Sequence, residues 1–74
     1  MREQQEYVVG EFVFDTKYKK IVKINWHWEG ESIYQTLWLS PEQNNPTGSE
    51  IAPAERLRKL TTKEEVMLRL RGLL

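Results

Sequence analysis

The sequence predicts a mainly β protein, with a small, strongly bent antiparallel sheet of four or five strands that closes as a barrel and one C-terminal α-helix. The first observation is the stretch 20–29, where polar side chains alternate with β-branched or aromatic ones. A period of two is typical of a half-buried strand. The second is the stretch 62–74, where leucine, valine and methionine recur at helical spacing behind a capping sequence.

The size and composition of the chain indicate one small domain. It has 74 residues, no cysteine, and 11 basic residues that balance 11 acidic ones. The lack of cysteine fits a reducing compartment and removes thiolate and zinc–cysteine chemistry, so we expect a cytoplasmic protein. A net charge of zero gives no overall attraction for nucleic acid or an anionic membrane. No apolar run reaches the length of about 20 residues that a membrane span needs.

Residues 1–6 are polar and are expected to form a flexible lead-in to a barrel over residues 7–60. The first strand is predicted over residues 7–14 (YVVGEFVF), where Gly10 indicates a bulge or a close backbone approach. Asp15 follows this strand and can accept backbone N–H bonds in an Asx-turn.

Residues 9–14 (VGEFVF), a short charged loop and residues 21–24 (IVKI) resemble the opening hairpin of small SH3-like barrels, including KOW-type modules. The chain has Lys19 and Lys20 where the KOW pattern has a second loop glycine. SH3-like folds commonly close with a short strand of the form acidic–x–leucine–basic–x–leucine, which residues 55–60 (ERLRKL) match. The resemblance therefore implies an SH3-like barrel, and it favours a strand over residues 55–60, with a helical turn over residues 53–56 as the alternative.

The stretch 20–39 is predicted to form the central hairpin, with its turn at Gly30, which supplies a positive φ. In its first strand Val22 and Ile24 share a face with Trp26 and Trp28, so we expect both tryptophans in the core. In its second strand both faces carry large apolar groups, which indicates a central strand buried on both sides.

A surface loop is expected over residues 40–50 because prolines, asparagines and a glycine leave no apolar periodicity there. Ile51 and Ala52 can pair briefly before Pro53 removes a ladder hydrogen bond.

The helix is predicted over residues 62–72, with a capping box formed by Thr62 and Glu65 and a stop at Gly72. Its apolar stripe consists of Val66, Met67, Leu70 and Leu74. Because about ten helical residues are unstable alone in water, the stripe is expected to dock on the barrel. The leucines at the end of the chain either complete the core or contact a second copy or a partner.

The aromatic residues are the most informative candidates for a binding site. Tyr34 and Trp38 lie on the opposite parity from Leu37 and Leu39, so both core and surface positions remain open for them. Exposed aromatic rings can stack on bases or grip a protein segment. His27, the one histidine, is expected to face solvent on its strand because no partner nucleophile or carboxylate is placed near it by spacing.

A basic cluster surrounds the first hairpin, and it contains Lys17, Lys19, Lys20 and Lys23 beside Tyr18. Such lysines can contact phosphates, or they can keep a loop soluble and an edge strand unpaired. A second basic group over residues 56–63 would strengthen a nucleic-acid site if it lay on the same face.

We expect a non-enzymatic intracellular interaction module that binds a protein partner through exposed aromatic residues and the 41–50 loop. Such compact chains resemble accessory proteins of phages or mobile elements. The alternative is a nucleic-acid-binding module that uses residues 17–23 with Trp38. The sequence predicts no cofactor, no metal and no catalytic residue, and a monomer or weak homodimer through the C-terminal helix. The partner-binding candidates are Tyr34, Trp38, His27, Lys17, Tyr18, Lys20 and Lys23.

Overall fold

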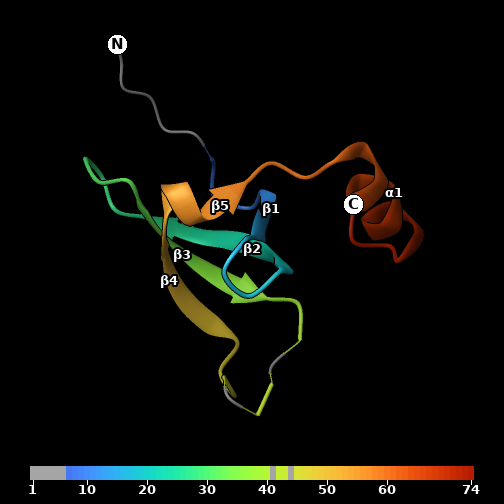
Figure 1. Ribbon diagram of the computed structural model, residues 1–74, viewed down its shortest axis with the longest axis horizontal. Helices are drawn as coiled ribbons and strands as arrows, with labels where there is room; N and C mark the ends of the chain where they lie inside the picture. The colour runs from blue at the N-terminus through green and yellow to red at the C-terminus, as the bar shows by residue number, and fades with distance from the viewer. Residues whose placement is uncertain (1–6, 41, 44) are drawn as a thin grey trace.

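The computed structural model describes residues 7–40, 42–43 and 45–74 and contains one five-stranded antiparallel sheet with a helix beside it (Figure 1). Its elements are β1 (Phe12–Asp15), β2 (Lys20–His27), β3 (Ile33–Trp38), β4 (Ser49–Pro53), the 3₁₀ turn η1 (Ala54–Arg56), β5 (Leu57–Arg58) and α1 (Thr62–Leu70). The mainly β fold with a C-terminal helix is therefore confirmed. The expected lead-in, residues 1–6, lies outside the described residues.

The strands lie in the order β4-β3-β2-β1-β5, which leaves β4 and β5 as the two edges of an unclosed sheet. In a flat sheet these edges would be roughly 19 Å apart, at about 4.8 Å for each strand spacing. All five strands nevertheless contribute to one hydrophobic cluster, so the sheet bends strongly around it. Its buried members are Tyr7, Val13, Val22, Ile24, Tyr34, Trp38, Ala52 and Leu57.

The first strand is shorter than predicted because the chain turns before it. Gly10 has a φ of +97°, which is a left-handed conformation that glycine adopts without strain. Its N–H donates to the carbonyl of Ile24 at 2.8 Å, and the Ile24 N–H donates to the carbonyl of Glu11 at 2.8 Å. A Cβ at this position would meet no heavy atom within 4 Å, so the positive φ, and not a close backbone approach, accounts for the glycine. Regular pairing begins only at Phe12.

A β-bulge at Asn25 changes the parity of β2. Ile24 pairs with Thr36 but Trp26 pairs with Gln35, so one extra residue lies in β2 between two consecutive positions of β3. Before the bulge Val22 and Ile24 face the core. After it, Trp26 faces outward, with 55 % of its surface exposed. The prediction that Trp26 lies in the core is therefore wrong, because strict alternation does not persist through the strand.

Trp28 also lies outside the core, since it is 39 % exposed after the end of β2. The turn that follows is as predicted, with Gly30 at a φ of +80°. The second hairpin strand, β3, alternates half-buried and buried residues along its whole length, and it is paired on both sides, by β2 and β4.

The segment after the 40–48 loop is more ordered than the sequence indicated. Five residue pairs join β4 to β3, from Leu37 with Ser49 to Ile33 with Pro53. Pro53 fits because it ends an edge strand, where no ladder partner needs its missing N–H. The two alternatives for the following segment both occur, since the η1 turn leads directly into the two-residue strand β5.

The N-cap of α1 lies one residue earlier than predicted. Thr61 is the N-cap, its side chain accepts from the Glu64 N–H, and the Glu64 carboxylate accepts from the Thr61 N–H. The capping box thus consists of Thr61 and Glu64, not Thr62 and Glu65. The predicted stop at Gly72 is confirmed. Gly72 has a φ of +78°, and the N–H groups of Gly72 and Leu73 donate to the carbonyls of Arg69 and Leu68, as in a Schellman motif.

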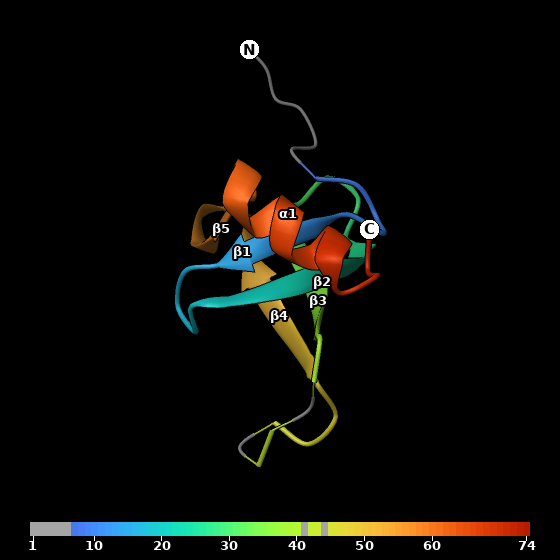
Figure 2. The same cartoon turned by 90° about the vertical axis from the view of Figure 1, so that its right-hand side faces the viewer.

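The face that α1 turns toward the sheet was also predicted incorrectly. Leu68 is fully buried, whereas Val66, Met67, Leu70 and Leu74 are 44, 49, 82 and 53 % exposed. Figures 1 and 2 place α1 on the side of the sheet that carries β1 and β2. Leu68 therefore anchors the helix. Val66 and Leu70 of the predicted stripe lie on the opposite side of α1 from Leu68, whereas Met67 borders the sheet.

The ion pair between Arg58 and Glu64 joins α1 to β5. Arg58 donates to both carboxylate oxygens of Glu64, at 3.0 and 2.9 Å, and its guanidinium lies 4.0 Å from the centroid of the Phe14 ring. The hydrogen bond from Arg58 and the backbone N–H of Thr61 lower the pKa of Glu64 from 4.5 to about 2. The ionised form of Glu64 is therefore favoured in the folded state.

We predict that the Glu64 carboxylate contributes to the free energy of unfolding above its unfolded pKa, near 4.5, and that this contribution is lost as the pH falls toward 2. Urea unfolding of Glu64→Gln at a series of pH values should show a lower stability at neutral pH and a shallower decline across that window. Glu65→Gln is the control, since Glu65 has no ion pair in the described part of the chain. Parallel curves for wild type and Glu64→Gln would contradict the prediction.

Candidate interaction surfaces

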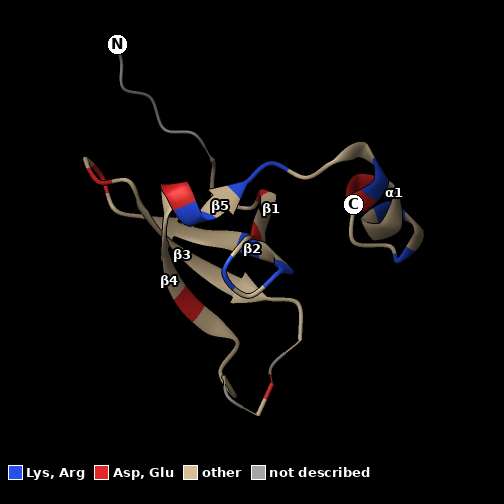
Figure 3. Cartoon of the chain, viewed as in Figure 1, with Lys and Arg blue, Asp and Glu red and all other residues tan. Residues whose placement is uncertain are grey.

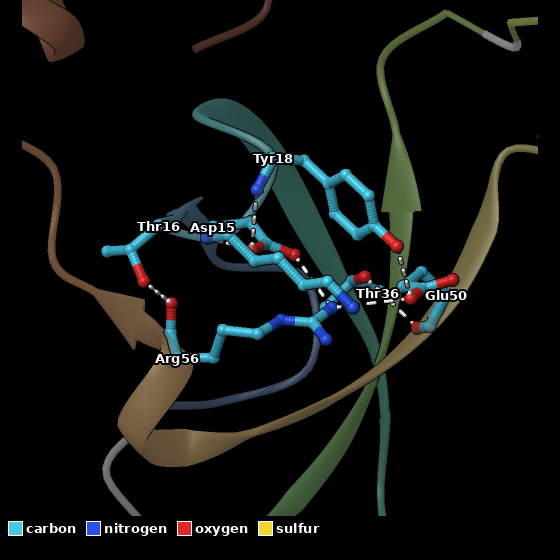
Figure 4. Close-up of polar contacts among 7 residues, drawn as sticks. Asp15, Thr16, Tyr18, Thr36, Glu50 and Arg56 are labelled. Carbon is cyan, nitrogen blue, oxygen red and sulfur yellow. Dashed lines mark hydrogen bonds and ion pairs between the residues drawn. The ribbon is translucent and has the colours of Figure 1, made fainter.

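A buried ion pair fixes the β1–β2 hairpin against the end of the sheet (Figure 4). Asp15 is fully buried at the end of β1, and its Oδ2 lies 3.0 Å from Nη2 of Arg56 in η1. Its Oδ1 accepts from the backbone N–H of Lys17 at 2.9 Å, as predicted for an Asx-turn. The Thr16 hydroxyl and N–H both donate to the Arg56 carbonyl. One carboxylate thus shapes the loop and also holds η1 in place.

The same cluster reaches the other edge of the sheet through Glu50 of β4. Its Oε2 accepts from the Tyr18 hydroxyl at 3.2 Å and lies 3.5 Å from Nη2 of Arg56. The Thr36 hydroxyl donates to the Glu50 carbonyl at 3.1 Å. Side chains from β4, the hairpin loop and η1 therefore meet where backbone pairing between the sheet edges is missing (Figure 4).

The lysines of the hairpin divide into two groups, and Figure 3 shows them as a blue loop between β1 and β2. Lys20 forms an ion pair with Glu42, and its Nζ lies 5.0 Å from the Trp38 ring centroid. Lys17, Lys19 and Lys23 are exposed and have no ion pair in the part of the chain that the structure describes. These three lysines are the accessible part of the predicted basic cluster.

The second predicted basic group does not extend that cluster, because three of its four members have carboxylate partners and the fourth, Lys63, is an exposed residue of α1. Arg56 pairs with Asp15, Arg58 with Glu64 and Lys59 with Glu11. Tyr18 is half-buried, with its ring 5.2 Å from Trp38 and 5.4 Å from the Arg56 guanidinium. The structure thus does not bring an open stacking platform next to the free lysines.

The two aromatic residues of β3 are core residues. Tyr34 is 1 % exposed and Trp38 is 7 % exposed, so the expectation that they form an exposed aromatic surface is wrong. Tyr34 packs edge-on against Tyr7, with ring centroids 5.5 Å apart. The cause lies in the parity of β3, whose even-numbered residues all face the concave side of the bent sheet.

His27 is half-buried and tied to its neighbours. It stacks on Tyr34 with ring centroids 4.6 Å apart, and its Nε2 lies 2.7 Å from the carbonyl oxygen of Glu31. A carbonyl only accepts, so this nitrogen donates. The prediction that His27 faces solvent is wrong, because the bulge at Asn25 turns His27 toward the sheet face that carries Tyr34.

Two exposed apolar side chains, with a glutamine between them, lie in a row across the opposite face of the sheet. Trp26 on β2, Gln35 on β3 and Ile51 on β4 are successive cross-strand partners, so their side chains share one face. Trp26 and Ile51 are 55 and 56 % exposed. Gln35 lies between them and bonds to Asn25 and Ser49. This set, hereafter the Trp26 surface, was missed because nothing in the local sequence marks the bulge.

The helix leaves both the Trp26 surface and a groove uncovered. The groove has a volume of about 410 Å³ and lies between α1 and the β1–β2 end of the sheet. Phe14, Ile21, Leu39 and Met67 form its apolar lining. Of its charged groups, Lys20 and Glu64 already have ion-pair partners. The groove therefore marks where α1 packs loosely beside its anchor.

Comparison of the chain with protein-family models, with curated protein sequences and with solved structures found no match. Within residues 7–40, 42–43 and 45–74, no group of three or more His, Cys, Asp or Glu side chains is placed to hold a metal ion. The described helices include none that is long and apolar enough to cross a membrane.

We predict that Asp15→Asn lowers the free energy of unfolding by about 3 kcal/mol, because it removes the nearer of the two carboxylates that pair with the largely buried Arg56 and leaves Glu50 at 3.5 Å. Arg56→Met should cost a similar amount, and the double variant should cost clearly less than the sum of the two. Urea unfolding measures all three values. Additive losses below about 1 kcal/mol each would show that the pair does not hold the hairpin.

Proposed function

We propose that the protein is a small non-enzymatic interaction module that binds a protein partner through the Trp26 surface. The observation that carries this proposal is the outward position of Trp26 on the same sheet face as the exposed Ile51, with Gln35 between them. Tryptophan is among the residues that contribute most to the binding energy of protein interfaces. Two exposed apolar side chains with a polar residue between them on one sheet face match the mixture of apolar and hydrogen-bonding groups found in protein interfaces.

The acid–base groups of the chain support a role in binding over catalysis. Asp15 and Glu64 are held by arginines, and the one histidine donates to a backbone carbonyl. These contacts stabilise the fold, and none of the three groups lies on the Trp26 surface. A partner with apolar side chains and backbone groups able to bond with Gln35 fits that surface best.

We infer that the fold is an SH3-like barrel whose closure is completed by side chains. The strand order, the 3₁₀ turn before β5 and the return of β5 to β1 all support this interpretation. The cluster of Asp15, Glu50 and Arg56 connects the edge strand β4 to the end of β1 and to η1, which precedes β5. Small barrels of this kind expose sheet faces and loops, and function must be argued from these sites.

The 41–50 loop remains part of the proposal as a neighbouring contact. Glu42 and Asn45 form reciprocal backbone hydrogen bonds, and the ion pair with Lys20 ties the loop to β2. Gln43, Pro46 and Thr47 are exposed, whereas Pro41 and Asn44 lie outside the described residues. The loop follows β3 and precedes β4, the two strands that carry Gln35 and Ile51.

We predict that Trp26→Ala weakens binding to a purified protein partner, captured on immobilised wild-type chain, by about 2 kcal/mol or more. Calorimetric titration gives this difference directly. Met67→Ala is the matched control, since Met67 is similarly exposed but lies on α1. Equal affinities of wild type and Trp26→Ala would contradict the proposed surface.

A second candidate function, nucleic-acid binding, is favoured by one specific observation. Lys17, Lys19 and Lys23 are exposed and free of ion pairs in the described chain. Exposed lysines bind phosphate and release counterions, which makes such binding strongly dependent on salt. The net charge of zero limits the affinity that this patch can provide.

If this second function holds, the double variant Lys17→Glu/Lys19→Glu should abolish oligonucleotide binding measured by fluorescence anisotropy at low salt. Lys20→Glu is a poorer test because Lys20 is already paired with Glu42. Lys63→Glu, which changes an exposed lysine of α1, is the control. Binding that persists in the hairpin variant, or that does not weaken with salt, would exclude a phosphate contact at this loop.

A further inference from the structure

The outer edge of β4 carries backbone groups that the sheet does not use. Facing residues in antiparallel strands alternate between pairs that exchange hydrogen bonds and pairs that do not. Just before β4, the Gly48 carbonyl accepts from the Trp38 N–H at 2.6 Å. Just after it, the Ala54 N–H donates to the Ser32 carbonyl at 2.8 Å. Both bonds continue the β3–β4 register, so the even-numbered residues of β4 bond to β3 and the N–H and C=O groups of the odd-numbered ones point away from the sheet.

The residues of β4 in this outward position are Ser49, Ile51 and Pro53. Two of them agree with the alternation. The Ser49 N–H donates to the Thr47 hydroxyl oxygen at 3.3 Å, and Pro53 has no N–H to offer to β3. Ile51 lies between them and is 56 % exposed. Its N–H and C=O are therefore open to solvent at the middle of the edge.

This edge lacks most of the features that keep an edge strand from pairing with another strand. Strand β4 contains no lysine or arginine, and its one charged side chain, Glu50, is held by Tyr18 and Arg56. Figure 1 shows no further strand of the described chain along its outer side. The opposite edge, β5, is only two residues long. Strand β4 is therefore the edge that can accept an added strand, as far as Pro53.

We propose that the protein partner binds as an extended segment that adds a strand to the outer edge of β4. This inference rests on the proposed function and names the form that the partner takes at the Trp26 surface. The partner backbone bonds to the N–H and C=O of Ile51, as in other complexes formed by strand addition. The partner side chain beside Ile51 shares its sheet face, so it extends the row of Trp26, Gln35 and Ile51. That side chain is apolar, and β-branched or aromatic types fit the position best.

A second copy of this chain fits the edge less well than a segment of another protein. Two β4 strands related by a two-fold axis run antiparallel. An axis at Ile51 or at Ala52 places Pro53 opposite an outward carbonyl, which then has no N–H to accept from. An axis at Glu50 places the two Glu50 side chains directly opposite each other, and like charges in that position are destabilising. A segment without proline or an acidic residue there avoids both costs.

Peptides selected from a random phage-displayed library on the immobilised wild-type chain are the probe, and calorimetric titration gives their affinities. Ile51→Pro removes the outward N–H, and proline is tolerated where an edge N–H faces solvent. Ile51→Ala is the matched control, since it shortens the side chain and keeps the N–H. We expect Ile51→Pro to bind about tenfold or more weakly than Ile51→Ala, a difference of about 1.4 kcal/mol. Equal affinities of these two variants for peptides that Trp26→Ala weakens overturn strand addition and leave the Trp26 surface in place. A library that yields no peptide sensitive to Trp26→Ala contradicts the proposed function itself, and the inference with it.

Amide hydrogen exchange of the wild-type chain gives a second test that does not depend on whether Ile51→Pro folds. In the free chain the Ile51 N–H should exchange faster than those of Glu50 and Ala52, because they bond to β3. Saturation with a selected peptide should slow the exchange of Ile51, and an Ile51 N–H that stays unprotected overturns the proposal. Sedimentation velocity of the free chain examines the other occupant. A dimer that Ile51→Pro abolishes and Ile51→Ala retains would identify a second copy at this edge and overturn the proposal as well.

Discussion

The extra residue at Asn25 determines which side chains at the end of β2 face the core. Val22 and Ile24 precede it and face the concave side of the sheet, and His27 follows it and stacks on Tyr34. Between them Trp26 is turned outward. A bulge also increases the local twist and bend of a strand, and a bent sheet is what allows five strands to surround one core in a chain of 74 residues.

A buried ion pair connects the end of β1 to η1. Asp15 contacts both the hairpin loop and η1, and Arg56 also pairs with Glu50 of β4. Such a cluster is stable only if its charges are compensated, since an unpaired buried charge is costly. The loop that carries the exposed lysines is therefore rigidly attached, while the helix depends on Leu68, the Arg58–Glu64 pair and its own caps.

Local patterns were sufficient to predict much of this arrangement. The hairpin turn at Gly30, the Asx-turn at Asp15 and the stop at Gly72 each depend on one residue and its neighbours, and all three occur. The outward position of Trp26 could not be predicted in this way, because a bulge depends on which backbone groups of β3 are available opposite it. Strand β4 was predicted as a brief pairing of Ile51 and Ala52 and is longer for a related reason, since its pairing with β3 overrides the loop-like composition before it.

The helix shows a different limit of prediction from sequence. Its stripe was recognised correctly as apolar, but periodicity alone does not say whether an apolar face meets the same chain or another molecule. Leu68 lies outside that stripe and is the residue that is buried. The candidate site thus moved from Tyr34 and Trp38 to Trp26 and Ile51, with no change in the predicted class of fold.

The measurement that tests the account most directly is acrylamide quenching of tryptophan emission in three variants that each retain one tryptophan. We expect the chain with Trp26 alone to emit at long wavelength and to be quenched readily, because more than half of its surface is exposed. The chain with Trp38 alone should emit at shorter wavelength and resist quenching. A protected Trp26 together with an accessible Trp38 would contradict the bulge and the proposed interaction surface.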